Sequence, residues 1–186
     1  VAAEFSYIYR AHDAKLWHNA YRQPLVGGTF FIGSVGNNQI LGRFAGLYGF
    51  VELPIVKLKK YRLDFKFATG LGYTNRPFDE VLNPENVAIG SRVNTMMCFA
   101  LKSSWRFKAY GLTFGLDMTH FSNASYQMPN LGVNVPYLSL GVQKFISPEQ
   151  KENPRPELKR PNLQFGLTGI VSGKEMNPKG VGRFPV

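Results

Sequence analysis

The chain has 186 residues, enough for one domain with a sizeable core, and a formal net charge of +10. No run of 18 apolar residues occurs, so a transmembrane helix is excluded, although the short alternating strands of a membrane barrel are not. The basic residues form no Lys/Arg stripe and no nucleic-acid motif is present, so we expect no nucleic-acid partner. Cys98 is the only cysteine, which argues against a disulfide framework and a paired-thiol metal site, and we predict neither a metal nor a cofactor.

Short segments in which apolar and polar residues alternate recur along the chain, separated by Gly, Pro, Asn and charged residues. Alternation with a period of two is typical of β-strands, and the 19 Gly and 12 Pro also favour strands and turns over long helices. In chain order the segments cover residues 3–10, 26–34, 40–53, 61–73, 96–107, 111–121 and 136–145, with a weaker eighth segment over 163–171.

One face of these segments is bulky and aromatic, and the other carries charges and small residues. In residues 40–53, for example, we assign Phe44, Tyr48 and Phe50 to the apolar face. The charges opposite the apolar faces are Arg43, Arg62, Asp64, Lys66, Lys102, Arg106 and Asp117. A soluble sandwich shows such a pattern when its charges face water, but a small transmembrane barrel, apolar outside and filled with polar pairs inside, predicts it more strongly.

We therefore predict an all-β fold, an antiparallel up-and-down transmembrane β-barrel of about eight strands, over residues 1–146. A soluble β-domain that binds an apolar ligand is the alternative. Residues 147–157 are charged and rich in proline, which is typical of an exposed loop or linker. Residues 147–186 are thus expected to form a loop-rich extension with the weak strand at 163–171, and continuation beyond Val186 stays open.

His120 and Ser122 form the most informative pair in the chain. Two residues that are two apart on a strand point to the same face, with Cα atoms roughly 6.5–7 Å apart. At that distance an imidazole can reach a serine hydroxyl, the minimum pairing for an activated nucleophile. The preceding residues of the same parity are all apolar: Leu112, Phe114, Leu116 and Met118. If this face meets lipid, the substrate is a lipid. The alternative is that His120 and Ser122 have no catalytic role, because both residue types are ordinary at a strand end that meets the membrane interface.

The sequence around this pair is Thr119-His120-Phe121-Ser122-Asn123-Ala124-Ser125, followed by Pro129-Asn130-Leu131-Gly132-Val133-Asn134. A His-x-Ser-Asn strand end followed by a Pro-Asn-x-Gly loop and a final strand resembles the outer-membrane lipid A deacylases of the PagL type. The resemblance is tightest over residues 111–145, looser over 40–94, and slight after 147. It implies an eight-stranded barrel in the outer membrane of a Gram-negative bacterium, a carboxylic ester hydrolase that removes an ester-linked 3-hydroxyacyl chain from lipid A in lipopolysaccharide.

The resemblance also implies a role for each residue of the motif. Ser122 would be the nucleophile and His120 the base that takes its proton. Asn130 and the backbone amides just after Ser122 would stabilise the oxyanion, and Asn123 and Ser125 belong to the same substrate-positioning segment. An unassisted hydroxyl is a poor nucleophile and a tetrahedral oxyanion needs nearby donors, so the chemistry requires residues of these types.

Asn134 and Ser125 depart from the pattern of the family. Asn134 stands at the position of the orienting acid, the third catalytic residue, and Ser125 replaces a glycine that some relatives have. Asn134 has the parity of Leu138 and Leu140, so we expect it to face outward, where its side-chain carbonyl could hold the tautomer of His120 but not stabilise the imidazolium with a full charge.

A second function therefore stays open: a catalytically inactive barrel that serves as a structural subunit of a membrane assembly, with other outer-membrane proteins as partners. Asp117 has the opposite parity from His120, and we expect an interior charge paired with Lys or Arg there rather than a catalytic acid. Asp79, Glu80 and Glu85 lie in a predicted loop whose distance from the pair the sequence does not fix.

Overall fold

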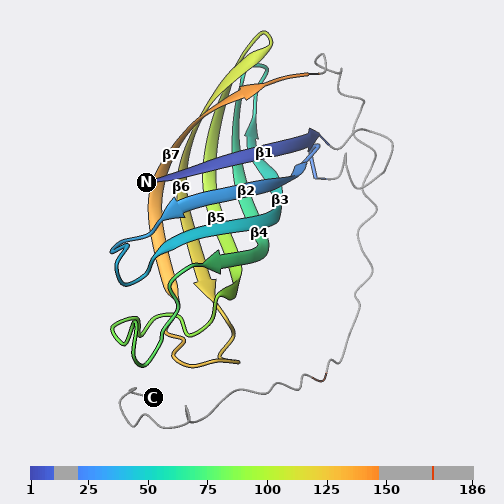
Figure 1. Cartoon of the computed structure of the whole chain (residues 1–186). Helices are drawn as coiled ribbons and strands as arrows, with labels where there is room; N and C mark the ends of the chain where they lie inside the picture. The colour runs from blue at the N-terminus through green and yellow to red at the C-terminus, as the bar shows by residue number, and fades with distance from the viewer. Residues whose placement is uncertain (11–20, 147–168, 170–186) are drawn as a thin grey trace.

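The computed structural model describes residues 1–10, 21–146 and 169 (Figure 1). They form one antiparallel seven-stranded sheet in which each strand pairs with its neighbours in the sequence. This confirms the predicted all-β up-and-down architecture; the eighth predicted segment, 163–171, lies outside the described residues except for Gly169. The strands are β1 (Ala2–Arg10), β2 (Leu25–Ser34), β3 (Arg43–Lys57), β4 (Tyr61–Thr74), β5 (Val93–Phe107), β6 (Tyr110–Ser122) and β7 (Val133–Lys144). The described part of the chain contains no helix that is long and apolar enough to cross a membrane.

The sheet is curled into a half-barrel, so that strands far apart in the order face each other across its concave side (Figure 1). Glu4 on β1 accepts hydrogen bonds from the hydroxyl groups of Tyr48 on β3, over 2.7 Å, and Tyr137 on β7, over 3.2 Å. The last of these contacts joins the two edge strands of the sheet through side chains. Within the described ranges, no backbone ladder joins β1 to β7.

Charged side chains fill part of the concave side, as the alternation of the strands predicts. The ion pairs there are Arg62 with Asp64 at 2.6 Å, Lys102 with Glu52 at 2.8 Å, and Lys66 with Glu4 at 3.6 Å. Because an unpaired buried charge is costly, this interior is stable only when its charges are matched in this way. Such pairs are typical of the narrow interior of a small barrel.

The convex side of the sheet is apolar. Large hydrophobic side chains that stand at least two-fifths exposed there include Phe30, Ile32, Leu47, Leu71, Phe107, Leu112, Leu116, Leu138, Leu140 and Val142. Soluble monomers rarely expose contiguous apolar surface of this extent. An apolar outside combined with a polar inside is typical of strands that face lipid.

One strand has the opposite orientation from the predicted one. In β3, Phe44, Tyr48 and Phe50 are buried on the concave side, only 1%, 2% and 7% exposed, and Arg43 stands exposed on the other face. The prediction was wrong here because both faces of this strand are largely apolar. Phe44 packs inside against Phe121 of β6, with ring centroids 4.8 Å apart, so its hydrophobicity reflects the core and not a surface.

Candidate active site

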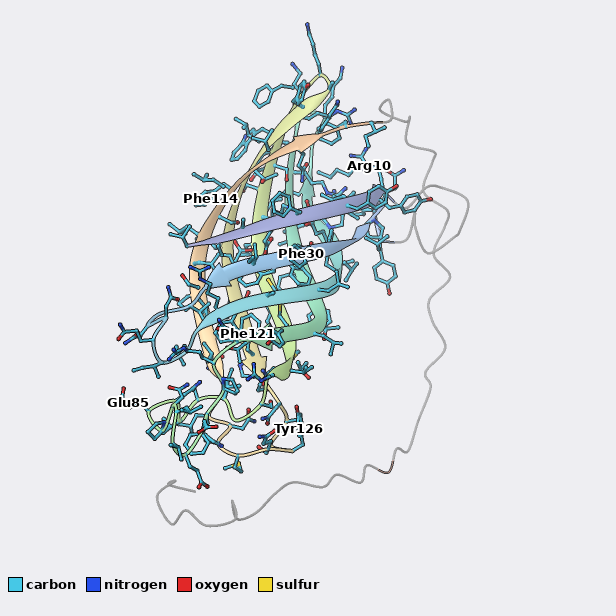
Figure 2. The ribbon with its side chains drawn as sticks, in the orientation of Figure 1. Arg10, Phe30, Glu85, Phe114, Phe121 and Tyr126 are labelled. Atoms are coloured by element: carbon cyan, nitrogen blue, oxygen red, sulfur yellow. The ribbon has the colours of Figure 1, made fainter. Side chains whose placement is uncertain are left out.

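His120 and Ser122 lie at the end of β6 on the convex, apolar face. The side chains that precede them on this face, Leu112, Leu116 and Met118, are 53%, 52% and 42% exposed. The intervening residues point inward, and Phe121 is fully buried. In Figure 2, Phe114 lies on the outer side of the sheet, whereas Phe121 lies within it. The parity that the sequence predicts for this strand is therefore correct.

Phe121 holds this end of β6 in place. Its ring packs against Phe44 on β3, with centroids 4.8 Å apart, and against Phe31 on β2, with centroids 6.1 Å apart. These contacts belong to the apolar core, which also includes Met96 at the start of β5 and Val133 at the start of β7. Close packing leaves such a strand end little freedom, so His120 and Ser122, on either side of Phe121, project from a fixed backbone.

Asn134 on β7 lies directly opposite His120 on β6 in the strand register. The two side chains form a hydrogen bond between Nδ1 of His120 and Oδ1 of Asn134, 2.7 Å apart. An amide oxygen only accepts, so Nδ1 carries a proton, and in the neutral ring Nε2 then presents its lone pair. An imidazole in this tautomer can accept a proton from a hydroxyl group. Within the described residues no hydrogen bond joins His120 to Ser122, and catalytic hydrogen bonds are often looser before substrate binds.

Gly132 completes the support of the imidazole. Its φ of +75° lies in the left-handed region, and a Cβ added there would come within 2.9 Å of Cε1 of His120. A side chain at this position would therefore be strained and would also push the ring away. The N–H of Gly132 donates to the carbonyl of Ala88 over 3.0 Å, which fixes this loop to the loop between β4 and β5. The Pro-Asn-x-Gly motif includes this glycine, but its packing against His120 has no sequence signal.

The turn after Ser122 brings the other motif residues together. Oδ1 of Asn130 accepts the backbone N–H of Asn123 over 3.0 Å, and Nδ2 of Asn130 donates to Oγ of Ser125 over 3.3 Å. Ala124 and Ser125 adopt φ values of 54° and 59°, a left-handed conformation that is uncommon for residues other than glycine. Their backbone N–H groups have no acceptor among the described residues.

The side chain of Asn123 points the other way, into the molecule, and is 2% exposed. Its Nδ2 donates to Oγ of Ser91 over 2.9 Å and to the carbonyl of Gln127 over 2.7 Å. This side chain therefore ties the turn after β6 to the segment that enters β5. Asn123 and Ser91 are 32 positions apart in the chain, so no local sequence pattern predicts this contact. Tyr126 and Glu85 mark the two loops at this end of the sheet (Figure 2).

No carboxylate among the described residues forms an ion pair with His120. Asp117 is an interior residue, as predicted; it accepts a hydrogen bond from Ser139 over 2.7 Å and forms no ion pair with a Lys or Arg that the structure describes. Asp79 accepts the backbone N–H groups of Leu82 and Val81 over 2.8 and 2.9 Å, and these bonds lower the pKa of its carboxyl group. Within the same residues no three potential metal ligands gather in one place.

An open hollow of about 560 Å³ lies on the outer face of the sheet, and neither His120 nor Ser122 lines it. The outer-face side chains that line it include Phe65, Phe99, Leu101, Leu116, Met118 and Leu138. Met118 is two residues before His120 on the same face of β6, so the hollow reaches the vicinity of the pair. Its apolar lining suits a hydrocarbon chain.

The model of one protein family, described as lipid A 3-O-deacylase (PagL), matches residues 3–143. The matched range includes nearly all of the seven-stranded sheet and every residue of the site described above. No curated protein and no solved structure matches the chain significantly.

Proposed function

Because the chain belongs to the lipid A 3-O-deacylase (PagL) family, we propose that it is a transmembrane serine esterase that removes an ester-linked 3-hydroxyacyl chain from lipid A. The family consists of outer-membrane enzymes that act on lipid A. The observation that carries the proposal is the placement of His120 and Ser122 on the apolar outer face, with the imidazole held by Asn134. A nucleophile on this face meets lipid rather than water.

The apolar outer face supports a location in the outer membrane of a Gram-negative bacterium. Its band of exposed hydrophobic side chains would contact the hydrocarbon region, and the ion pairs inside would be shielded from it. The acyl esters of lipid A lie in the outer leaflet, close to the boundary with the sugar headgroup. Ser122 at the end of β6 is suited to that depth.

The mechanism begins with the hydrogen bond from Nδ1 of His120 to Asn134, which leaves Nε2 free to accept a proton. Rotation of the Ser122 side chain brings its hydroxyl group to Nε2 while Asn134 holds the ring, and Oγ attacks the ester carbonyl carbon as its proton moves to His120. Collapse of the tetrahedral intermediate breaks the bond to the sugar oxygen, which takes the proton from His120. A water molecule activated by the same imidazole then hydrolyses the acyl-enzyme.

The negatively charged oxygen of the tetrahedral intermediate needs hydrogen-bond donors, which the turn after Ser122 can supply. We assign this role to Nδ2 of Asn130 and to the backbone N–H groups of Ala124 and Ser125, which have no acceptor among the described residues. An amide nitrogen carries two hydrogens, so Asn130 can bond Ser125 and still donate to substrate. The N–H of Asn123 already donates to Asn130, and its side chain lies inside. Asn123 therefore acts by holding the turn, not by touching the substrate.

The proposal is tested by mass spectrometry of lipid A from a host that carries hexa-acylated lipid A, with and without the protein in its outer membrane. We expect the loss of one 3-hydroxyacyl chain per lipid A and the release of the free 3-hydroxy fatty acid. Heat-modifiable migration in electrophoresis would establish that the barrel has folded. An unchanged acyl count under those conditions would contradict the proposal.

A second candidate function is a catalytically inactive barrel that is a subunit of an outer-membrane assembly. The observation that favours it is that His120 is paired with an amide and not with a carboxylate. Correctly folded protein that leaves lipid A intact but co-purifies in a defined complex from gently solubilised outer membranes would support this function.

Replacing Asn134 tests whether its hydrogen bond orients the imidazole of His120. The variant N134E should raise kcat about tenfold, because a charged hydrogen bond to the imidazolium is worth roughly 1.4 kcal/mol more than a neutral one. The variant N134L, which keeps the volume but cannot accept a hydrogen bond, should lower kcat at least about tenfold. Initial rates of fatty acid release measure both effects. Full activity in N134L would show that Asn134 does not orient His120.

The hollow that Met118 lines should hold the scissile acyl chain. The variant M118W fills the part of the hollow nearest to His120 and should lower kcat/KM about tenfold for long 3-hydroxyacyl chains, with a smaller effect on short ones. The control is L112W, on the same face of β6 but outside the hollow, which should leave the chain-length preference unchanged. Equal effects of both variants would argue against an acyl site here.

A further inference from the structure

Arg92 stands just before β5, at the same end of the sheet as Ser122, and its side chain is exposed. Ser122 is paired with Thr95 of β5 in the strand register. Arg92 precedes Thr95 by three residues, which separates their Cα atoms by roughly 10 Å in an extended chain. The guanidinium group lies beside Tyr73 of β4, on the side of β5 away from β6, so a substrate whose ester lies at Ser122 reaches it by extending across β5.

The guanidinium group of Arg92 has most of its hydrogen-bonding capacity available. Nη1 donates to the hydroxyl of Tyr73 over 3.3 Å. Among the described residues no carboxylate lies within ion-pair distance of this arginine. Tyr73 is itself 43% exposed. Within the described part of the chain, this cation and the phenol hydroxyl beside it therefore face outward without a counter-ion.

Ser91, which precedes Arg92, and Asn123, which follows Ser122, connect the backbone at Arg92 to the backbone at Ser122. Asn123 donates to Oγ of Ser91 over 2.9 Å inside the molecule. The carbonyl of Arg92 accepts the N–H of Thr74 over 2.9 Å, which fixes its backbone to β4. Because the inward neighbours are bonded to each other, Ser122 and Arg92 are presented outward at a fixed spacing. A fixed spacing between a nucleophile and a cation can position a substrate that carries an ester and an anion.

We propose that Arg92, with Tyr73, binds a phosphate monoester on the sugar of the lipid substrate and so positions the ester at Ser122. The inference rests on the proposed function and adds the headgroup chemistry that the site recognises. Lipid A carries phosphate groups on its glucosamine sugars, and the planar fork of a guanidinium group matches the oxygens of a phosphate. Arg92 is a positioning residue, since it touches the phosphate and not the reacting atoms.

The test compares R92Q with the unaltered protein on two substrates that carry the same acyl ester, phosphorylated lipid A and enzymatically dephosphorylated lipid A. We expect R92Q to lower kcat/KM about tenfold or more on the phosphorylated substrate and to leave hydrolysis of the dephosphorylated one unchanged. The variant R92K, which keeps the charge, should lose less. The control K59Q removes a positive charge from the turn between β3 and β4, at the opposite end of the sheet, and should alter neither rate.

A binding measurement separates this proposal from the proposed function. Detergent-solubilised S122A should bind phosphorylated lipid A about tenfold or more tightly than dephosphorylated lipid A, and R92Q in that background should remove the difference. If the unaltered protein hydrolyses neither lipid while this binding preference holds, the esterase function fails and the phosphate site stands. Three results would overturn the site: no effect of R92Q, equal effects on both substrates, or competition by inorganic phosphate as strong as by phosphorylated lipid A.

Discussion

Replacing Ser122 with alanine is expected to abolish deacylation, with a fall in kcat of about 10⁴-fold or more. The hydroxyl would be the only group that forms the covalent bond to the acyl chain. Its removal should not disturb the fold, because Ser122 lies on the outer face and its hydroxyl group makes no hydrogen bond among the described residues. Mass spectrometry of lipid A measures the loss, and heat-modifiable migration reports whether the barrel is intact.

The matched control for this variant is S103A. Ser103 is on β5 and its Oγ lies 3.2 Å from the hydroxyl of Tyr61, near the other end of the sheet. The variant S103A therefore loses a hydroxyl group and one hydrogen bond far from the active site, and we expect its activity to be close to that of the unaltered protein. If S122A kept more than about a hundredth of the activity, another nucleophile would have to be found.

Replacing His120 has the second largest expected effect. The variant H120A should lower kcat about 10³-fold or more, because Ser122 would then have no base to take its proton. The ring lies against Gly132 and at the exposed end of β6, so its removal leaves a space that small molecules can enter. Imidazole added to the assay should restore part of the activity of H120A.

The same addition should do nothing for S122A, because imidazole replaces a base and not a nucleophile. This contrast separates a chemical role of His120 from a structural one. A variant that has merely lost its fold would not respond to imidazole and would also lose heat-modifiable migration. Absence of rescue in a folded H120A protein, together with nearly full activity, would contradict the role of His120 as a base.

Much of the fold can be predicted from the alternation of apolar and polar residues. Each antiparallel strand pairs with the next one along the chain through a short turn, so the pattern within each strand is enough to identify it. In β6 the apolar positions before His120 and Ser122 have one parity, and the structure places them outside. Asn134 likewise faces outward, as its parity with Leu138 and Leu140 predicts. The parity prediction was wrong for β3, because Phe44 faces inward although its side chain is as hydrophobic as one that faces lipid. Alternation identifies faces only where the two faces differ.

The parts of the site that could not be predicted are contacts between loops. Asn123 binds Ser91, and Gly132 binds Ala88, across sequence separations that carry no periodic signal. Arg92 joins the site for the same reason, since only the pairing of β5 with β6 brings it near Ser122. The motif predicted which residues lie in the turn after β6, but the structure was needed to show that Asn123 points inward.

Ser122 is tested as the nucleophile by identifying the residue that a lipophilic fluorophosphonate labels in the folded protein. If Ser122 is an activated nucleophile that faces lipid, peptide mass spectrometry should find the phosphonyl adduct on Ser122, and H120A should lose nearly all of the labelling. A folded protein that stays unlabelled, or that carries the adduct at other serines to the same extent, would show that Ser122 is not an activated nucleophile.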